Sequence, residues 1–319
     1  AGVVVFHESG FPSVESETPS RESLAEALNG LEAEFLDVDG LQDPDALTDA
    51  DLLVLPYGSA FPADAWPTIR GYLRRGGNLL NLGGRALWVP VFKDPEVAEG
   101  FRQDRPQGTY WRTLAPVHAA EVPRNDYSRF AWDPVFPFES ETIRVRRVFT
   151  IDTLFVANFA SPEGRWRGLG WFFDEAGHKI ASPVTRLDYF VLPAGRQAKG
   201  HGRFVMLPFE PEAGYWDSAD GRSLIREAAQ HAALGSALVW LQTPLASVHE
   251  GEIAQAVLHL RDRQPPKDSA TADTRVRVEL EHEGETIDTQ IVAVASAELD
   301  ENLHFPRATT PGPVSYTHL

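Results

Sequence analysis

The chain has 319 residues, of which 29 are Lys or Arg and 46 are Asp or Glu, so its formal net charge is −17. A surface this acidic repels phosphate backbones, and no apolar run reaches the ~18–20 residues of a membrane span, so neither nucleic-acid binding nor membrane insertion is expected. Cysteine is absent, which excludes disulfides, thiolate metal ligands and a cysteine nucleophile.

Strands and helices are predicted to alternate through the first 84 residues. Continuous apolar runs predict buried strands over residues 3–6, 33–38, 51–56 and 78–82. Helical spacing of apolar residues predicts helices over 20–31, capped by Ser20, and over 62–75, ended by Gly76 and Gly77. This alternation predicts βαβ units in a doubly wound, mainly parallel sheet, with any ligand at the carboxyl ends of its strands.

The alternation of predicted strands and helices stops between about residues 90 and 200. Alternating segments at 144–146, 153–156 and 166–173, the last followed by a turn at 175–178, predict an antiparallel insertion. The parallel sheet is expected to resume at 202–208, and a helix is expected over 221–234, ended by Gly235.

The composition changes again after residue 236. Strands are predicted over 237–241, 253–260, 275–280 and 286–294, with period-two alternation in the last two. They indicate the first part of an immunoglobulin-like sandwich, which needs about seven strands, so the sandwich is expected to be truncated. We therefore expect an α/β domain over 1–236, interrupted at about 90–200, and a partial sandwich over 237–313.

Both ends of the chain are unusual. It begins without an initiator Met, and residues 314–319 resemble one reading frame of a sequencing-library adapter. The expectation is that 314–319 is foreign sequence and that the chain is a metagenomic fragment of a longer protein. The alternative is a natural C-terminus with a short polar tail.

The run DLLVLPYGSAFPADAWPTIRGYLRRGGNLLNLGG, residues 51–84, resembles the class I glutamine-amidotransferase-like superfamily. More narrowly, it resembles the branch with the trimerisation domain of certain beta-galactosidases and the trehalose-utilisation-type proteins, and the resemblance returns at 200–235. It implies a flavodoxin-like fold. In true amidotransferases the position that matches Gly83 carries a cysteine; glycine has no nucleophilic atom, so the resemblance implies no catalytic residue here and no cofactor.

The resemblance also implies a role. Relatives of this kind lie beside glycosidase barrels and β-sandwiches, and LQTPLASVHEGEIAQAVLHLRD (residues 241–262) resembles the opening of such a sandwich. We expect a non-catalytic structural or assembly domain of a larger glycoside hydrolase or polysaccharide-processing protein, located outside the cell or in the periplasm. Its expected partners are other domains of the same polypeptide, further copies of itself, and carbohydrate. A ligand or subunit contact is expected at the strand ends, at Tyr57, Ser59, Gly83, Gly84, Arg85 and Glu210.

Two alternatives remain open. Aromatic rings stack on sugars, so a carbohydrate-binding module could use Trp111, Trp132, Trp166 and Trp216, although packing of the insertion against the sheet explains these residues more simply. A hydrolase would need paired carboxylates roughly 5–10 Å apart, for which the pairs Glu139 with Glu141 and Glu210 with Glu212 are candidates. With 46 acidic residues, such pairs also arise by chance.

No motif for a metal or a nucleotide is present. The histidines lack the HxH or HExxH spacing of a zinc site, and residues 37–40 (DVDG) lack the later ligands of a calcium loop, so a strand end and turn is expected there. Walker A, G-x-G-x-x-G and G-x-S-x-G patterns are also missing. The sequence therefore predicts neither a metal site nor a cofactor.

Overall fold

An eight-stranded sheet organises the first of the two compact units into which the chain divides, Ala1–Gly235 and Ser236–Leu319. The structure is a computed structural model, and it describes residues 2–105, 119–123, 129–134, 136, 138, 140, 143–151, 164–190, 201–235, 237–242, 247–248, 254–262, 275–282, 285–293, 298–305, 312–313 and 315–318. Each unit is described by itself below.

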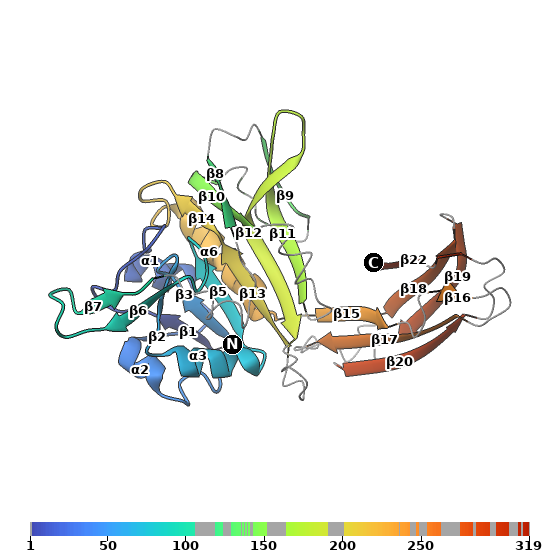
Figure 1. The fold of residues 1–319 in the computed structure, drawn as a ribbon, viewed down its shortest axis with the longest axis horizontal. Helices are drawn as coiled ribbons and strands as arrows, with labels where there is room; N and C mark the ends of the chain where they lie inside the picture. The colour runs from blue at the N-terminus through green and yellow to red at the C-terminus, as the bar shows by residue number, and fades with distance from the viewer. Residues whose placement is uncertain are drawn as a thin grey trace. The chain divides into compact units, whose positions relative to one another are not determined.

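Five strands of the large sheet are parallel, and three further strands continue it in antiparallel pairing (Figure 1). The parallel strands are, in spatial order, β2 (Ala33–Leu36), β1 (Val3–Phe6), β3 (Leu52–Leu55), β5 (Asn78–Leu82) and β13 (His201–Leu207). The antiparallel strands that continue it are β12 (Lys179–Phe190), β11 (Gly164–Phe173) and β9 (Arg129–Trp132). The prediction of an α/β fold with a mainly parallel sheet is confirmed. Three strands of the predicted insertion extend the same sheet.

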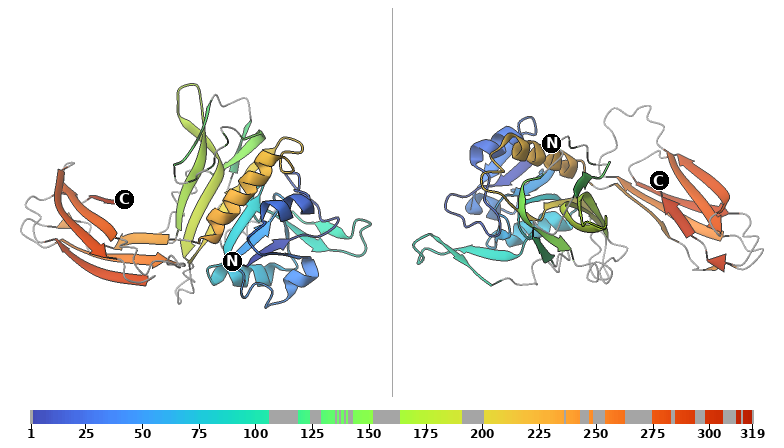
Figure 2. Two further views of the ribbon diagram at one scale, coloured as in Figure 1. Left: turned by 180° about the vertical axis from the view of Figure 1, so that it is seen from behind. Right: turned by 90° about the horizontal axis from the view of Figure 1, so that it is seen from above.

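Helices cover both faces of the sheet (Figure 2). They are α1 (Arg21–Ala27), α2 (Val38–Gln42), α3 (Trp66–Arg74) and α6 (Ala219–Ala233). Side chains alternate along a strand, so Val3 and Val5 of β1 pack in a cluster with residues of α1 and α6, and Val4 and Phe6 pack with residues of α2 and α3. The predicted Ser20 cap is confirmed, because its hydroxyl accepts from the Ser23 amide at 3.2 Å.

Two local predictions are wrong. Residues 37–40 are not a strand end and turn: the Asp37 carboxylate accepts from the Gly40 amide at 2.8 Å and begins α2. Aspartate is a strong N-cap residue, and this helix is too short for apolar periodicity to reveal it. The helix predicted over 62–75 begins only at Trp66, and residues 60–62 form a strand, β4 (Ala60–Pro62), which pairs in parallel with β6 (Val89–Lys93).

Two small sheets and a hairpin complete the first unit. β6 lies between β4 and β7 (Phe101–Gln103), and β10 (Val145–Ile151) lies between β14 (Phe209–Pro211) and β8 (Ala119–Pro123). The predicted turn at 175–178 is confirmed, since β11 and β12 form an antiparallel hairpin around it. The strand predicted at 153–156 lies outside the described residues.

The second unit contains only antiparallel strands within its described residues. Its three groups are β15 (Ala237–Gln242), β17 (Ala254–Asp262) and β20 (Glu298–Phe305); β19 (Glu285–Ala293), β18 (Arg275–His282) and β22 (Ser315–His318); and the pair β16 (Ser247–Val248) and β21 (Gly312–Pro313). Strand β20 was missed by the sequence analysis. Strand β22 pairs with β18 and lies within residues 314–319, which were expected to be foreign sequence.

Across the described part of the chain, no helix has both the length and the apolarity to span a bilayer.

Candidate functional site

The carboxyl ends of the parallel strands meet at one edge of the large sheet, where the ligand edge was predicted. Three of its six candidates are in contact there: the Arg85 amide donates to Ser59 Oγ at 2.6 Å, and a Cβ on Gly84 would lie 2.5 Å from the same oxygen. The Gly84 amide donates to the Phe209 carbonyl at 3.2 Å, which joins the end of β5 to the strand that carries Glu210.

Gly83 and Gly84 form a tight turn, here called the elbow, directly after β5. Both adopt left-handed backbone conformations, with φ of +77° and +56°. The buried Asn81 side chain holds this turn, because its Nδ2 donates to the carbonyls of Gly58 at 3.1 Å and Gly83 at 2.8 Å. The elbow is therefore fixed against the β3–β4 connection.

A loop from the end of β1, residues 8–19, lies over the elbow and is called the strap. A Cβ built on Gly83 would lie 2.1 Å from Ser16 Oγ and 2.3 Å from Ser16 Cβ, closer than non-bonded atoms can approach. The space that a side chain at position 83 would need is therefore filled by Ser16. No nucleophilic side chain can project from the elbow while the strap is in place.

Glu15 is the functional-site residue that the sequence analysis missed. Its carboxylate makes an ion pair with Arg85 and accepts a hydrogen bond from the Ser59 hydroxyl. Arg85 Nε donates to Oε2 at 2.9 Å. Glu15 itself is in the left-handed region, with φ of +60°, which is unusual for a residue with a Cβ. One glutamate among so many acidic residues gives no sequence signal, so only the fold reveals it.

Tyr57 supports the strap and is itself buried. Its hydroxyl donates to the Glu8 carbonyl and accepts from the Glu8 amide, both at 2.8 Å. Burial raises the pKa of this phenol. Because the ring also packs against Phe6 and Phe11, Tyr57 contributes to the architecture of the edge and presents no free hydroxyl to a ligand.

Glu210 is held by two arginines of the neighbouring strand β10. Its carboxylate oxygens lie 2.9 Å from Arg146 Nη1 and 2.6 Å from Arg147 Nε. Glu139 and Glu141, the other predicted carboxylate pair, lie outside the described residues, and Glu212 is exposed. Both oxygens of the Glu210 carboxylate are therefore engaged by arginine side chains.

The four tryptophans do not form one platform in the described part of the chain. Trp216 is 2% exposed and donates from Nε1 to Ser16 Oγ at 3.1 Å, so its ring cannot stack on a sugar in this structure. Trp132 packs against the cluster that contains α6, and Trp166 packs against the cluster on the opposite face of the sheet. Trp111 lies outside the described residues.

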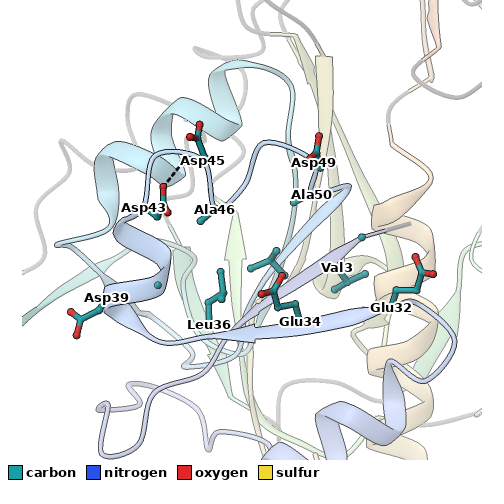
Figure 3. A pocket seen from close by; sticks show the side chains of 13 residues that line it. Val3, Glu32, Glu34, Leu36, Asp39, Asp43, Asp45, Ala46, Asp49 and Ala50 are labelled. Carbon is teal, nitrogen blue, oxygen red and sulfur yellow. Dashed lines mark hydrogen bonds between the residues drawn. The ribbon is translucent and has the colours of Figure 1, made fainter.

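A hollow of about 640 Å³ lies over β2 and the start of β1. Its lining is strongly acidic and includes Glu32, Glu34, Asp39, Asp43, Asp45 and Asp49. Figure 3 shows the Asp39, Asp45 and Asp49 carboxylates spread along its rim instead of converging on one point. Correspondingly, no group of three or more His, Asp or Glu side chains in the described residues is arranged to hold a metal ion.

The comparisons with known proteins find likenesses of fold only. No family model matches the sequence, and no curated protein matches it. Among solved structures, the GH42 beta-galactosidase Gan42B is 10% identical, with a TM-score of 0.40, over 96% of this chain and 40% of that chain. A beta-galactosidase from the haloarchaeon Halorubrum lacusprofundi is 14% identical, with a TM-score of 0.39, over 99% of this chain and 39% of that chain.

A ThuA-like protein from Bacteroides uniformis ATCC 8492 is 8% identical, with a TM-score of 0.40, over 73% of this chain and 90% of that chain. The chain thus spans about 40% of the length of the two beta-galactosidases. Identities and TM-scores this low assign no family and no activity to the chain.

Proposed function

We propose that this chain is a catalytically silent structural or assembly module of a larger glycoside hydrolase. In this proposal residues 1–236 form an amidotransferase-like, flavodoxin-like domain with an insertion at about 90–200, and residues 237–313 form part of an immunoglobulin-like sandwich. The parent protein is secreted to the periplasm or the cell exterior, where the module holds other domains or further copies of the chain together.

The proposal rests on the elbow, where Ser16 fills the space that a side chain at position 83 would need. Acyl-transfer chemistry at a strand end needs a side chain that can attack a carbonyl, and it needs space for the substrate around that side chain. Position 83 has no such side chain, and Ser16 lies where its first atom would be. The absence of cysteine from the chain removes the most direct substitute.

The domain assignments have support from topology. The parallel strands follow the order β2-β1-β3-β5-β13, which is the 2-1-3-4-5 order of flavodoxin-like sheets when they are numbered along the chain. In the second unit, the order β15-β17-β20 matches that of strands A, B and E of an immunoglobulin-like sandwich, and β18 and β19 form a separate antiparallel pair, as expected for its second sheet.

The test uses the present chain and its parent protein. Residues 1–319 alone are expected to show no turnover of a panel of nitrophenyl glycosides, of glutamine or of nitrophenyl acetate. Deletion of residues 1–235 from the parent is expected to lower the number of subunits in the assembly, obtained as the molar mass from light scattering divided by the mass of the shortened chain, while glycoside hydrolysis survives.

Turnover by residues 1–319 that disappears in a Glu210→Gln variant would contradict the proposal and point to the carboxylate site. A parent protein without any glycosidase domain would also overturn it.

A further inference from the structure

The Glu15 carboxylate lies in a cradle of hydrogen-bond donors at the elbow. The Arg85 guanidinium grips both carboxylate oxygens, with Nε donating to Oε2 at 2.9 Å and Nη2 donating to Oε1. The Ser59 hydroxyl donates to Oε2 and in turn accepts from the Arg85 amide at 2.6 Å. A two-pronged guanidinium contact with an added hydroxyl donor is a strong and geometrically selective way to bind a carboxylate.

The donors are positioned by contacts that do not involve Glu15. Ser59 is fully buried in the β3–β4 connection, and the Arg85 guanidinium lies over the rings of Trp88 at 5.2 Å and Phe149 at 5.1 Å. Rings on which a guanidinium stacks restrict its orientation. The cradle therefore belongs to the sheet edge, whereas the carboxylate comes from the strap.

The strap reaches the cradle in a strained conformation. Glu15 adopts φ of +60°, which for a residue with a Cβ crowds the following carbonyl. Its side chain is mostly buried, so the contact also removes a charge from water. A strained backbone is retained where a strong local interaction fixes it, and the carboxylate contact is that interaction here.

We propose that Arg85 and Ser59 form a carboxylate-binding site that Glu15 of the same chain occupies, so that closure of the strap and binding of a small monocarboxylate exclude each other. The ligand class follows from the shape of the group now bound, a carboxylate on one or two methylene groups. The inference does not depend on the silent role proposed above, because it concerns binding and not turnover.

The experiment replaces the internal carboxylate with an external one. Glu15→Ala removes Cγ and the carboxyl group, which together have the shape of acetate, and Glu15→Gly also removes Cβ, which matches propionate. The thermal midpoints of both variants and of the unmodified chain are compared in sodium acetate, sodium propionate and sodium chloride at equal pH and ionic strength. A ligand that binds only the folded state raises the thermal midpoint of the protein. With the matched anion at several times its Kd, the midpoint of each variant is expected to rise by about 2–4 °C.

Two controls separate site binding from general salt effects. The exposed Glu32 also has a positive φ, +50°, so Glu32→Ala tests the loss of a glutamate from this type of backbone away from the cradle. Its response to acetate is expected to equal that of the unmodified chain. The double variant Glu15→Ala with Arg85→Ala is expected to lose the acetate response.

Equal acetate shifts in Glu15→Ala, Glu32→Ala and the unmodified chain would overturn the proposal, as would a full response in the double variant. If Glu15→Ala does not fold in chloride, its refolding yield is measured in acetate instead. Recovery in acetate alone supports the site, and recovery in neither salt overturns it. If the proposed non-catalytic role is wrong, residues 1–319 will show turnover of a substrate, and this result is independent of the thermal midpoints.

Discussion

Position 83 has room for a hydrogen atom and nothing larger. Gly83→Ala adds a Cβ 2.1 Å from Ser16 Oγ at a backbone with φ of +77°. The combined strain and overpacking are expected to lower the free energy of unfolding by about 2–4 kcal/mol, measured by urea denaturation.

The matched control is Gly177→Ala in the β11–β12 hairpin. Gly177 has a similar φ of +86°, and a Cβ there meets nothing within 4 Å, so only the backbone cost of about 1 kcal/mol is expected. Ser16→Gly should restore part of the loss in the Gly83→Ala background, because it removes the collision but not the unfavourable φ. Equal losses at positions 83 and 177 would show that Ser16 is not the obstacle.

Part of the candidate site could be predicted from sequence. Ser59, Gly84 and Arg85 follow predicted strands directly, and parallel strands bring such positions together, so their proximity follows from topology. Glu15 and Ser16 could not be found in this way, because the strap has no periodicity and its path depends on the sheet beneath it. Trp216 was a candidate for a sugar platform, with packing as the simpler explanation, and it packs against Phe209 and is buried.

At the scale of elements, a buried ion-pair cluster joins β12, β13 and α6. The Asp188 side chain is 3% exposed and pairs with Arg203 Nε at 2.6 Å and Arg186 Nε at 2.9 Å. Arg203 Nη1 also donates to the His231 carbonyl at 2.9 Å. The cluster therefore connects the antiparallel strand β12 to the parallel strand β13 and to α6, the last helix of the unit.

Asp188→Asn is expected to lower the free energy of unfolding by about 3–5 kcal/mol, because it leaves buried arginines without their counter-charge. Urea denaturation gives the value. Asp174→Asn, the same change in the exposed hairpin, should leave the urea midpoint unchanged; a similar loss in both variants would mean that burial of the ion pair is unimportant.

The same cluster predicts a dependence of stability on pH. Burial, followed by the charges of the neighbouring arginines, lowers the pKa of His231 from 6.5 to about 3. Since the folded state binds this proton more weakly than the unfolded state, the stabilising effect of a neutral ring is complete above pH 6.5. It is lost as the pH falls toward 3.

The slope from this group should approach ~1.4 kcal/mol per pH unit between those limits, and His231→Gln should remove it. Urea denaturation at intervals from pH 7 to pH 4 measures both chains. An unchanged slope in the variant would show that His231 does not control this part of the profile.

Elements with strong periodic patterns could be predicted, and short or long-range ones could not. The apolar runs of β1, β3 and β5 and the helix that Ser20 caps are local signals, and they appear in the structure as expected. Helix α2 has five residues, too few to show a period. The pairing of β4 with β6 joins residues about thirty positions apart, and such contacts depend on the path of the intervening chain.

For the whole molecule, the two compact units are expected to unfold separately. Each contains its own buried apolar residues, for example Leu80 and Val205 in the first unit and Leu258 and Phe305 in the second. Calorimetry of residues 1–319 should show two transitions, and a chain of residues 1–235 should reproduce one of them. A single transition that disappears when the chain is shortened would contradict this division.

The collision between Ser16 and Gly83 also limits how the molecule can change through mutation. Any substitution that places a side chain at position 83 is harmful while Ser16 remains, whatever chemistry the new side chain offers. A change at Ser16 alone removes its hydrogen bond with Trp216 and brings no catalytic gain. A nucleophile at the elbow therefore requires two substitutions, of which neither is favoured alone, and this epistasis works against its appearance by single substitutions.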